Sequence, residues 1–315
     1  MFLCENYPYL KEPEVEYSQI FENNPNIVLP STSVLQKANG RDREIIDFDI
    51  EIVKFIAQVK FATFEQLFRF KEYLMATDER FSKNLELQAD KGFGRLRKFT
   101  SLRVLNRFAY SLNSDDYFPK VNNGEFIVYT LDHGGAKIME AFTEYPQMYE
   151  YKITDAYKPM KRVFKELILT DFYLSTLGGS ALSFNKNNRV FLNGDIFRPS
   201  SILIARQGDD FYSFLGEAFY KGDVYFSNQL FEMYDSLFSS KKVQAITQGK
   251  ACLVLICEDK DTVLMLNSIV EKSHIDSFRF TTFEKLKEEL WAEGALYKVK
   301  DGEVIPITGA YFSKI

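Results

Sequence analysis

The segment between residues 91 and 107 carries a local excess of positive charge that is suited to binding phosphate. It holds six basic side chains and no acidic one, in a chain whose formal net charge is −5. Arginine and lysine neutralise the phosphates of duplex DNA, and arginine also reads the edge of guanine in the major groove. The basic residues are Lys91, Arg95, Arg97, Lys98, Arg103 and Arg107. This basic run predicts a local contact with DNA.

Within the basic run, Arg97, Lys98 and Arg103 are the first choices for DNA contacts. Asn122 and Asn123, in a turn further along the chain, are secondary candidates. The alternative is a solvated basic face without a ligand. The order of elements favours DNA, because a helix, a capped helix, a basic element and a hairpin follow one another as in a winged helix.

Other patterns that carry chemistry are incomplete. GFGR at 92–95 lacks the third glycine and the preceding strand of a dinucleotide fingerprint, and QGKA at 248–251 lacks the upstream glycine of a P-loop. Three cysteines and two histidines form neither a disulfide framework nor a zinc-finger pattern. Cys252 and Cys257 lie in the run ACLVLIC, which indicates a buried strand and not a reactive pair. We therefore expect no cofactor, no metal and no catalytic residue.

The composition indicates a globular protein of two domains. The chain has 315 residues, 46% of them hydrophobic and 26% charged, and 30 phenylalanines and 18 tyrosines predict an aromatic core. The acidic balance excludes a protein that coats nucleic acid over its whole surface. No apolar stretch approaches the roughly 18 residues that span a bilayer, and no basic and apolar leader is seen. We expect a cytoplasmic protein without a membrane partner.

Periodicity locates the first helices. Residues 1–44 show no sustained period and predict a partly ordered arm. Apolar residues recur every three or four positions from Ile45 to Val59, as in a helix that lies on a core. Thr63 followed three residues later by Gln66 is a capping box that begins a second helix.

The basic run is the third element of this domain. The positions expected to face inward are Phe93, Leu96, Phe99 or Thr100, Val104 and Phe108. Turn residues and the β-type run EFIVYTL then predict a hairpin, the wing, and DHGGAKIMEAF returns to helical spacing. The sequence thus predicts a winged helix-turn-helix domain over residues 45–148.

The second half alternates helices and strands. The pattern predicts an α/β domain over residues 149–300 with a partly parallel sheet, and a tail over 301–315. The expected helices cover 160–168, 226–237, 261–270 and 283–294, and the expected strands cover 189–192, 200–205, 211–220, 251–257 and 277–283.

Two segments resemble the plasmid replication-relaxation family, proteins of bacterial plasmids and other mobile elements. They are VYTLDHGGAKIM at 128–139 and RPSSILIAR…FYSFLGEAFYKGD between 198 and 223. The resemblance covers residues 46–270. It implies an N-terminal winged helix followed by a restriction-endonuclease-like domain, and a role in replication, conjugative transfer or transcription control.

The second segment departs from the pattern of an active nuclease. In the family, Arg-Pro-Asp begins one strand and a glutamate lies in the next. Here Ser200 takes the place of the aspartate, Glu217 that of the glutamate, and Phe219 that of a lysine. Phosphodiester hydrolysis of this type needs two carboxylates for a divalent ion and a lysine near the attacking water. We therefore expect an inactive domain.

The leading hypothesis is a DNA-binding accessory or regulatory protein. Its partners would be double-stranded DNA, a second copy of the chain as a homodimer, and a replication or conjugation protein. One alternative is a metal-dependent nuclease in which Asp195 and Lys221 join Glu217, although Asp195 lies in the turn-like sequence NGD. A second alternative is a protein-interaction scaffold that does not bind DNA. Three alternatives stay open for the arm at residues 1–44. It masks the basic run, it exchanges between protomers, or it is disordered.

Overall fold

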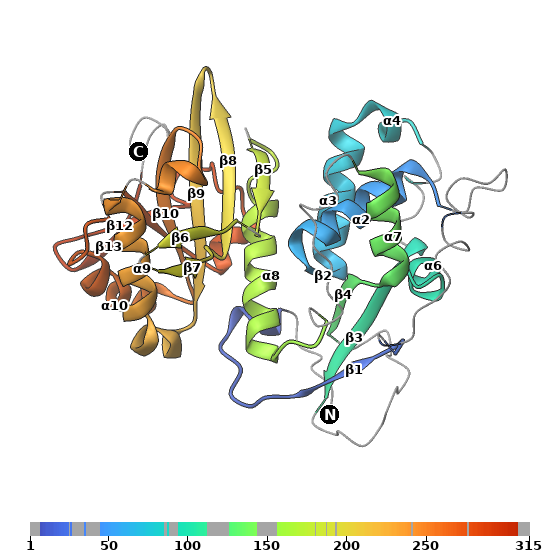
Figure 1. The fold of residues 1–315 in the computed structure, drawn as a ribbon, viewed down its shortest axis with the longest axis horizontal. Coiled ribbons are helices and arrows are strands. Elements are labelled where there is room, and N and C mark those ends of the chain that lie inside the picture. Colours follow the sequence, from blue (N-terminus) through green and yellow to red (C-terminus); the bar gives the residue numbers. More distant parts are fainter. Residues whose placement is uncertain are drawn as a thin grey trace. The chain divides into compact units, whose positions relative to one another are not determined.

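The chain divides into two compact units (Figure 1). The computed structural model describes residues 7–24, 26, 35, 45–84, 87, 94–111, 126–143, 156–179, 181–186, 188–192, 194–240, 242–275 and 277–307. The first unit comprises Met1–Pro8 and Pro13–Thr170, and the second comprises Tyr9–Glu12 and Asp171–Ile315. Both units combine helices with β-sheets, so the predicted α/β class is confirmed.

The first unit begins its core with α2 (Asp47–Val59), whose predicted apolar face is buried. β2 (Phe61–Thr63) leads into α3 (Phe64–Thr77). The predicted capping box is present, because the Gln66 N–H donates to Thr63 Oγ1 at 3.2 Å and the Thr63 N–H donates to Gln66 Oε1 at 3.0 Å. These bonds satisfy backbone groups that the first turn of a helix leaves without partners.

The sheet of the first unit is antiparallel, with the strand order β1-β3-β4-β2. Its further strands are β1 (Ser18–Phe21), β3 (Leu105–Ser111) and β4 (Ile127–Leu131). Its further helices are α4 (Glu79–Ser82), α6 (Arg95–Ser101) and α7 (His133–Phe142). Part of the N-terminal arm therefore supplies an edge strand of this sheet.

The basic run does not form one continuous element. Leu96, Phe99, Val104 and Phe108 are buried as expected, but Phe108 lies on strand β3 and not on the helix that carries Leu96. The cause is a break after α6, where Arg103 adopts a φ of 57°. A positive φ cannot continue a right-handed helix, so the chain turns there into the strand.

The boundary between the units falls within α8 (Met160–Leu174). In the first unit, Gln66 Nε2 donates to the Leu167 carbonyl at 2.8 Å and Thr170 Oγ1 donates to the Phe61 carbonyl at 2.9 Å. These bonds attach α8 to α3 and β2. Among the described helices, none combines the length and the apolar character needed to cross a lipid bilayer.

The second unit is built on a seven-stranded sheet of order β13-β12-β11-β10-β9-β8-β5. Strands β9, β10 and β11 are parallel and the outer pairs are antiparallel, which confirms the predicted partly parallel sheet. The strands are β5 (Ala181–Asn185), β8 (Ser201–Gln207), β9 (Asp210–Phe219), β10 (Lys250–Cys257), β11 (Phe278–Thr282), β12 (Tyr297–Lys300) and β13 (Glu303–Pro306).

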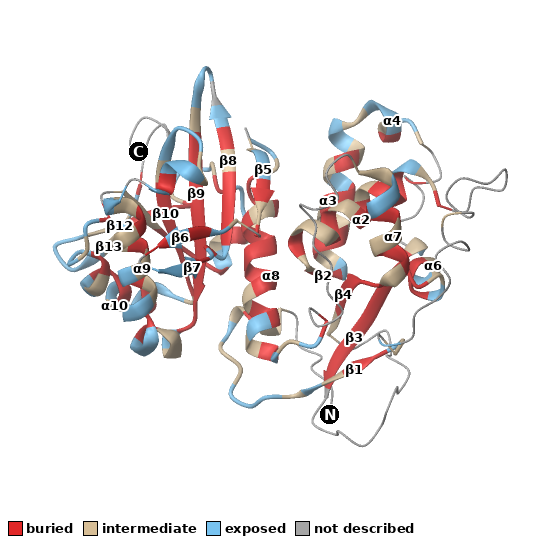
Figure 2. Cartoon of the chain, in the orientation of Figure 1, coloured by how far each residue is buried: buried red, intermediate tan, exposed pale blue. Residues whose placement is uncertain are grey.

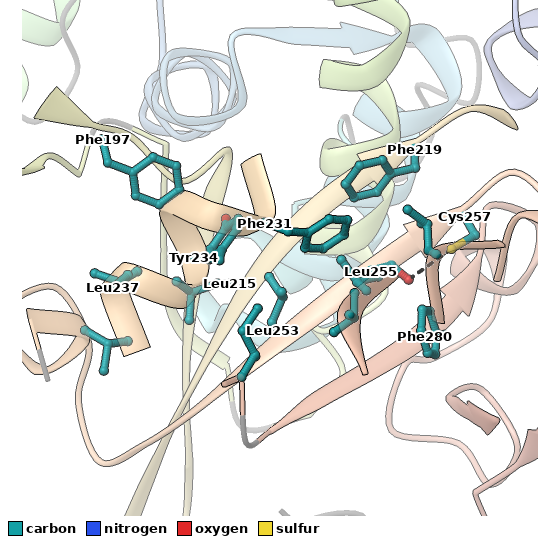
Figure 3. Packing of buried hydrophobic residues seen from close by; sticks show 14 of the residues in the cluster. Phe197, Leu215, Phe219, Phe231, Tyr234, Leu237, Leu253, Leu255, Cys257 and Phe280 are labelled. Atoms are coloured by element: carbon teal, nitrogen blue, oxygen red, sulfur yellow. Dashed lines mark hydrogen bonds between the residues drawn. The ribbon is translucent and has the colours of Figure 1, made fainter. Parts of the chain in front are cut away.

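Two helices, α9 (Asn228–Ser239) and α10 (Lys260–Val270), connect the parallel strands, and β6 (Val190–Leu192) and β7 (Asp195–Phe197) form a separate hairpin. The central strands are buried along most of their length (Figure 2). Figure 3 shows side chains of β9 and β10 packed against those of α9. This contact buries the apolar faces of both layers.

Cys252 and Cys257 lie in β10, as predicted, and both are fully buried. Burial raises the pKa of each thiol, and for Cys257 the nearby charge of Asp259 adds to the shift. Because the thiolate is the reactive form, both cysteines act as core side chains.

The predicted helix over 283–294 is wrong. Only the short 3-10 helix η6 (Glu284–Lys287) forms there. The Leu290 N–H donates to the Ser175 carbonyl at 2.8 Å and Trp291 Nε1 donates to the Thr176 carbonyl at 3.1 Å. These bonds to a distant turn replace the local helical pattern. The segment expected to be a tail also contributes strand β13.

Four residues from the start of the chain belong to the second unit. Tyr9, in the 3-10 helix η1 (Pro8–Leu10), is fully buried, and its hydroxyl donates to Asp171 Oδ2 at 2.8 Å. Lys287 Nζ donates to both oxygens, at 2.7 Å to the Tyr9 hydroxyl and 3.0 Å to Asp171. Tyr220 donates its hydroxyl to the Tyr9 carbonyl at 2.6 Å.

Glu12 also attaches the N-terminal segment to the rest of the second unit. Its N–H donates to Glu258 Oε1 at 3.0 Å, and its own carboxylate accepts from the Gly222 N–H at 2.7 Å. The second unit is therefore assembled from two separate stretches of sequence.

Substitution of Tyr9 should destabilise the second unit although Tyr9 is remote from it in sequence. Tyr9→Ala leaves a cavity beside the buried Asp171 and should lower the free energy of unfolding by about 3 kcal/mol or more. Urea denaturation followed by the fluorescence of Trp291, the chain's single tryptophan, measures this. Tyr225→Ala is the control, since Tyr225 is 74% exposed and its loss should cost under about 0.5 kcal/mol. Equal midpoints for the two variants would contradict the role given to Tyr9.

Candidate nucleic-acid interface

The basic residues of α6 divide between its two flanks. Leu96, Phe99 and Thr100 are buried, so they define the inner face of the helix. Arg95 and Lys98 are three residues apart and share one flank, whereas Arg97 lies on the other. Arg97 is exposed and Lys98 is half-buried.

Arg95 joins α6 to α2 through an ion pair with a buried carboxylate. Its Nε donates to Asp49 Oδ1 at 2.6 Å, and its Nη2 contacts Asp49 Oδ2. Asp49 is fully buried and also accepts from the Ile46 N–H at 2.9 Å. Burial raises the pKa of Asp49, and the hydrogen bond and charge of Arg95 oppose that shift. Arg95 thus has a structural partner.

Arg103 is held by a second buried ion pair. Its Nε lies 2.5 Å from Asp132 Oδ2, and its Nη2 donates to Asp132 Oδ1 at 3.1 Å. Nη2 also donates to the Asn24 carbonyl at 2.9 Å. Asp132 precedes α7 and accepts the N–H of His133 at 2.7 Å, which makes it the N-cap of that helix.

Arg107 lies in a row of side chains across the sheet. Its Nε lies 2.5 Å from Glu22 Oε2, and Arg107 pairs directly with Tyr129 in the register of β3 and β4. Its guanidinium hydrogen-bonds to the Tyr129 phenol. Burial raises the pKa of Tyr129, and the charges of Arg107, Glu22 and Arg97 all act on it. Arg97 therefore lies near this row.

The structure thus separates the predicted contact residues into two groups. Arg95, Arg103 and Arg107 bind carboxylates of the first unit itself, whereas Arg97 and Lys98 project from the outer flanks of α6. Lys91, Asn122 and Asn123 lie outside the described residues.

The sequence interpretation missed Glu22 and Tyr129. Tyr129 stands in the predicted strand EFIVYTL, and its neighbour across the sheet follows only from the strand register. Glu22 directly follows the four-residue strand β1, which is too short to show a clear alternation.

Glu217 occupies a separate polar site in the second unit. It is buried in β9 and accepts the Ser200 N–H at 2.8 Å, the Ser200 hydroxyl at 2.5 Å and the Tyr234 hydroxyl at 2.5 Å. Burial raises the pKa of Tyr234 well above its usual value, and the charge of Glu217 adds to the shift. The phenol therefore stays protonated and donates to the carboxylate.

The other two residues of the alternative nuclease site have different surroundings. Asp195 is exposed at the first position of β7, opposite Leu192 in the β6–β7 hairpin, so it is a strand residue next to the turn that the sequence NGD predicted. Lys221 Nζ lies 3.6 Å from Asp261 Oδ2. Within the described ranges, no cluster of three or more histidine, cysteine, aspartate or glutamate side chains is suited to hold a metal ion.

No family model, no curated protein and no solved structure matches the chain.

The two groups of basic residues should respond differently to the same substitution. Arg103→Gln leaves the buried Asp132 carboxylate without its cation and should lower the free energy of unfolding by about 3 kcal/mol. Arg97→Gln changes an exposed side chain and should alter it by less than about 0.5 kcal/mol. Urea denaturation followed by far-ultraviolet circular dichroism tests the difference, and a larger loss for Arg97→Gln would refute it.

Glu217 should act as a structural carboxylate. Glu217→Gln weakens bonds to Ser200 and Tyr234 and should lower the free energy of unfolding by about 2 kcal/mol. Asp195→Asn, at the exposed start of β7, is the control and should leave the urea midpoint unchanged. The outcome that contradicts this role is unchanged stability for both variants together with loss of a magnesium-dependent DNA cleavage seen with the unsubstituted protein.

Proposed function

We propose that the protein binds double-stranded DNA through a winged helix in its first unit. The order α2, β2, α3, α4, α6, β3, β4 supports this proposal, because helices followed by a β-hairpin are the order of a winged helix, and α4 adds only a four-residue helix between α3 and α6. In this arrangement α6 enters the major groove, and the antiparallel strands β3 and β4 belong to the wing. The observation that carries the proposal is the projection of Arg97 and Lys98 from a helix whose inner face is buried.

Few cations take part in this contact. Arg97 is exposed and Lys98 is half-buried on α6, so these two side chains provide the accessible positive charge of this helix. Phosphate contacts position a protein on DNA, and a small number of them gives binding that depends on salt. The acidic net charge agrees with a local contact.

The second unit has a supporting role in this proposal. Ser200 directly precedes β8 and Glu217 lies in the adjacent β9, with Ser201 opposite Gly216 in the register. This placement agrees with the resemblance to a restriction-endonuclease-like domain in which a serine replaces the first carboxylate. Because Glu217 accepts hydrogen bonds from Ser200 and Tyr234, we propose that this unit binds a second copy or a partner protein and does not cleave DNA.

The biological setting follows the same resemblance. The proposal is an accessory or regulatory protein of a plasmid or another mobile element, which acts in the cytoplasm in replication, conjugative transfer or transcription control, as implied for the plasmid replication-relaxation family.

Loss of the Arg97 and Lys98 charges on α6 should weaken DNA binding. In fluorescence-anisotropy titrations against a mixed-sequence duplex, the double variant Arg97→Gln, Lys98→Gln should bind about ten-fold more weakly. The slope of log affinity against log salt concentration should become shallower by an amount that corresponds to about two phosphate contacts. The matched control is Arg206→Gln, Lys250→Gln, which removes two exposed charges from the second unit.

Equal affinities for the unsubstituted protein and the α6 variant would reject the winged-helix contact. A similar loss in the Arg206 and Lys250 variant would indicate a general charge effect. The same samples, incubated with magnesium and separated on a gel, should show intact DNA.

A further inference from the structure

A row of three polar side chains crosses the sheet of the first unit beside α6. Glu22 directly follows β1, Arg107 lies on β3 and Tyr129 on β4. The register pairs Phe21 with Phe108, and the Glu22 N–H donates to the Arg107 carbonyl at 2.8 Å, so Glu22 lies opposite Arg107. Opposed residues of an antiparallel pair project from the same face. The three side chains therefore form one continuous polar row.

The arm is fixed to α6 and β3 immediately after this row. Asn23 Nδ2 donates to the Thr100 carbonyl in the last turn of α6 at 3.0 Å, and Asn106 Nδ2 donates to the Asn23 carbonyl at 2.9 Å. The Asn24 carbonyl accepts from Arg103. The arm segment at residues 22–24 thus lies directly against the basic run.

The carboxylate in the row is the accessible member. The Glu22 side chain is 37% exposed, whereas the Arg107 side chain is 10% exposed. Glu22 therefore covers an arginine of β3, the strand that directly follows α6. Arginine binds carboxylates and phosphates through the same planar geometry. Because the Glu22 carboxylate is partly exposed, a competing anion from solvent can reach the pair and replace the carboxylate.

We propose that Glu22 occupies the position of a DNA phosphate on Arg107, so that the N-terminal arm competes with duplex DNA for this arginine. The inference rests on the proposed function. When the carboxylate is displaced, Arg107 joins Arg97 and Lys98 as a further phosphate contact, and the Tyr129 phenol keeps the guanidinium in place. The arm thereby lowers the affinity of the first unit for DNA.

Neutralising Glu22 should strengthen DNA binding. In anisotropy titrations of the full chain against a mixed-sequence duplex at low salt, Glu22→Gln should bind about five-fold more tightly. The slope of log affinity against log salt concentration should become steeper by an amount that corresponds to about one phosphate contact. Glu14→Gln is the matched control, because it removes an exposed charge from the same arm and should change affinity by less than about two-fold. The gain should disappear when Arg107→Gln is added to Glu22→Gln.

The outcomes separate this inference from the proposed function. If Arg97→Gln, Lys98→Gln weakens binding while Glu22→Gln leaves it unchanged, the competition is refuted and the winged-helix contact stands. If the gain persists with Arg107→Gln, the arm does not act through Arg107 and the inference is overturned. If neither the unsubstituted protein nor Glu22→Gln binds the duplex, both proposals fail. Binding by Glu22→Gln alone would support complete masking by the arm.

Discussion

The buried ion pair between Asp132 and Arg103 fixes the corner at which the elements of the first unit meet. Arg103 ends α6 with its positive φ, and its carbonyl accepts the Gly134 N–H at 2.8 Å. The Asp132 N–H donates in return to the Val104 carbonyl at 3.0 Å. A Cβ on Gly135 would lie 2.4 Å from the same carbonyl oxygen, so this approach requires glycine. The position of α6 on the sheet depends on this corner.

The basic run shows why a count of charges in a sequence differs from the charge on a surface. Asp49, Asp132 and Glu22 each hold one arginine of the run, and the first two are fully buried. Removing two charges from water is favourable only when they bind each other with good geometry. Much of the local positive charge therefore organises the first unit, and a smaller part faces outward.

Local patterns predicted the elements whose signals lie within a few residues. Thr63 and Gln66 marked a helix start, and the apolar run around Cys252 and Cys257 marked a buried strand, because capping and burial leave short, regular signatures. The helix expected near Trp291 did not form, since bonds to Ser175 and Thr176 determine that segment. The charge of the basic run located the candidate interface. The carboxylate that binds Arg107 could not be predicted in the same way, because Glu22 and Arg107 meet only through strand pairing.

The place of Tyr9 in the second unit has a consequence for the order of folding. Tyr9 bonds to residues 162, 211 and 278 positions further along the chain, which are Asp171, Tyr220 and Lys287. Contacts of such long sequence separation form late, because a large loop must close first. During synthesis on the ribosome, Tyr9 and Glu12 emerge before residues Pro13–Thr170 of the first unit and must wait for their partners. The second unit is a discontinuous domain, with Pro13–Thr170 of the first unit between its two pieces, and only the nearly complete chain can close it.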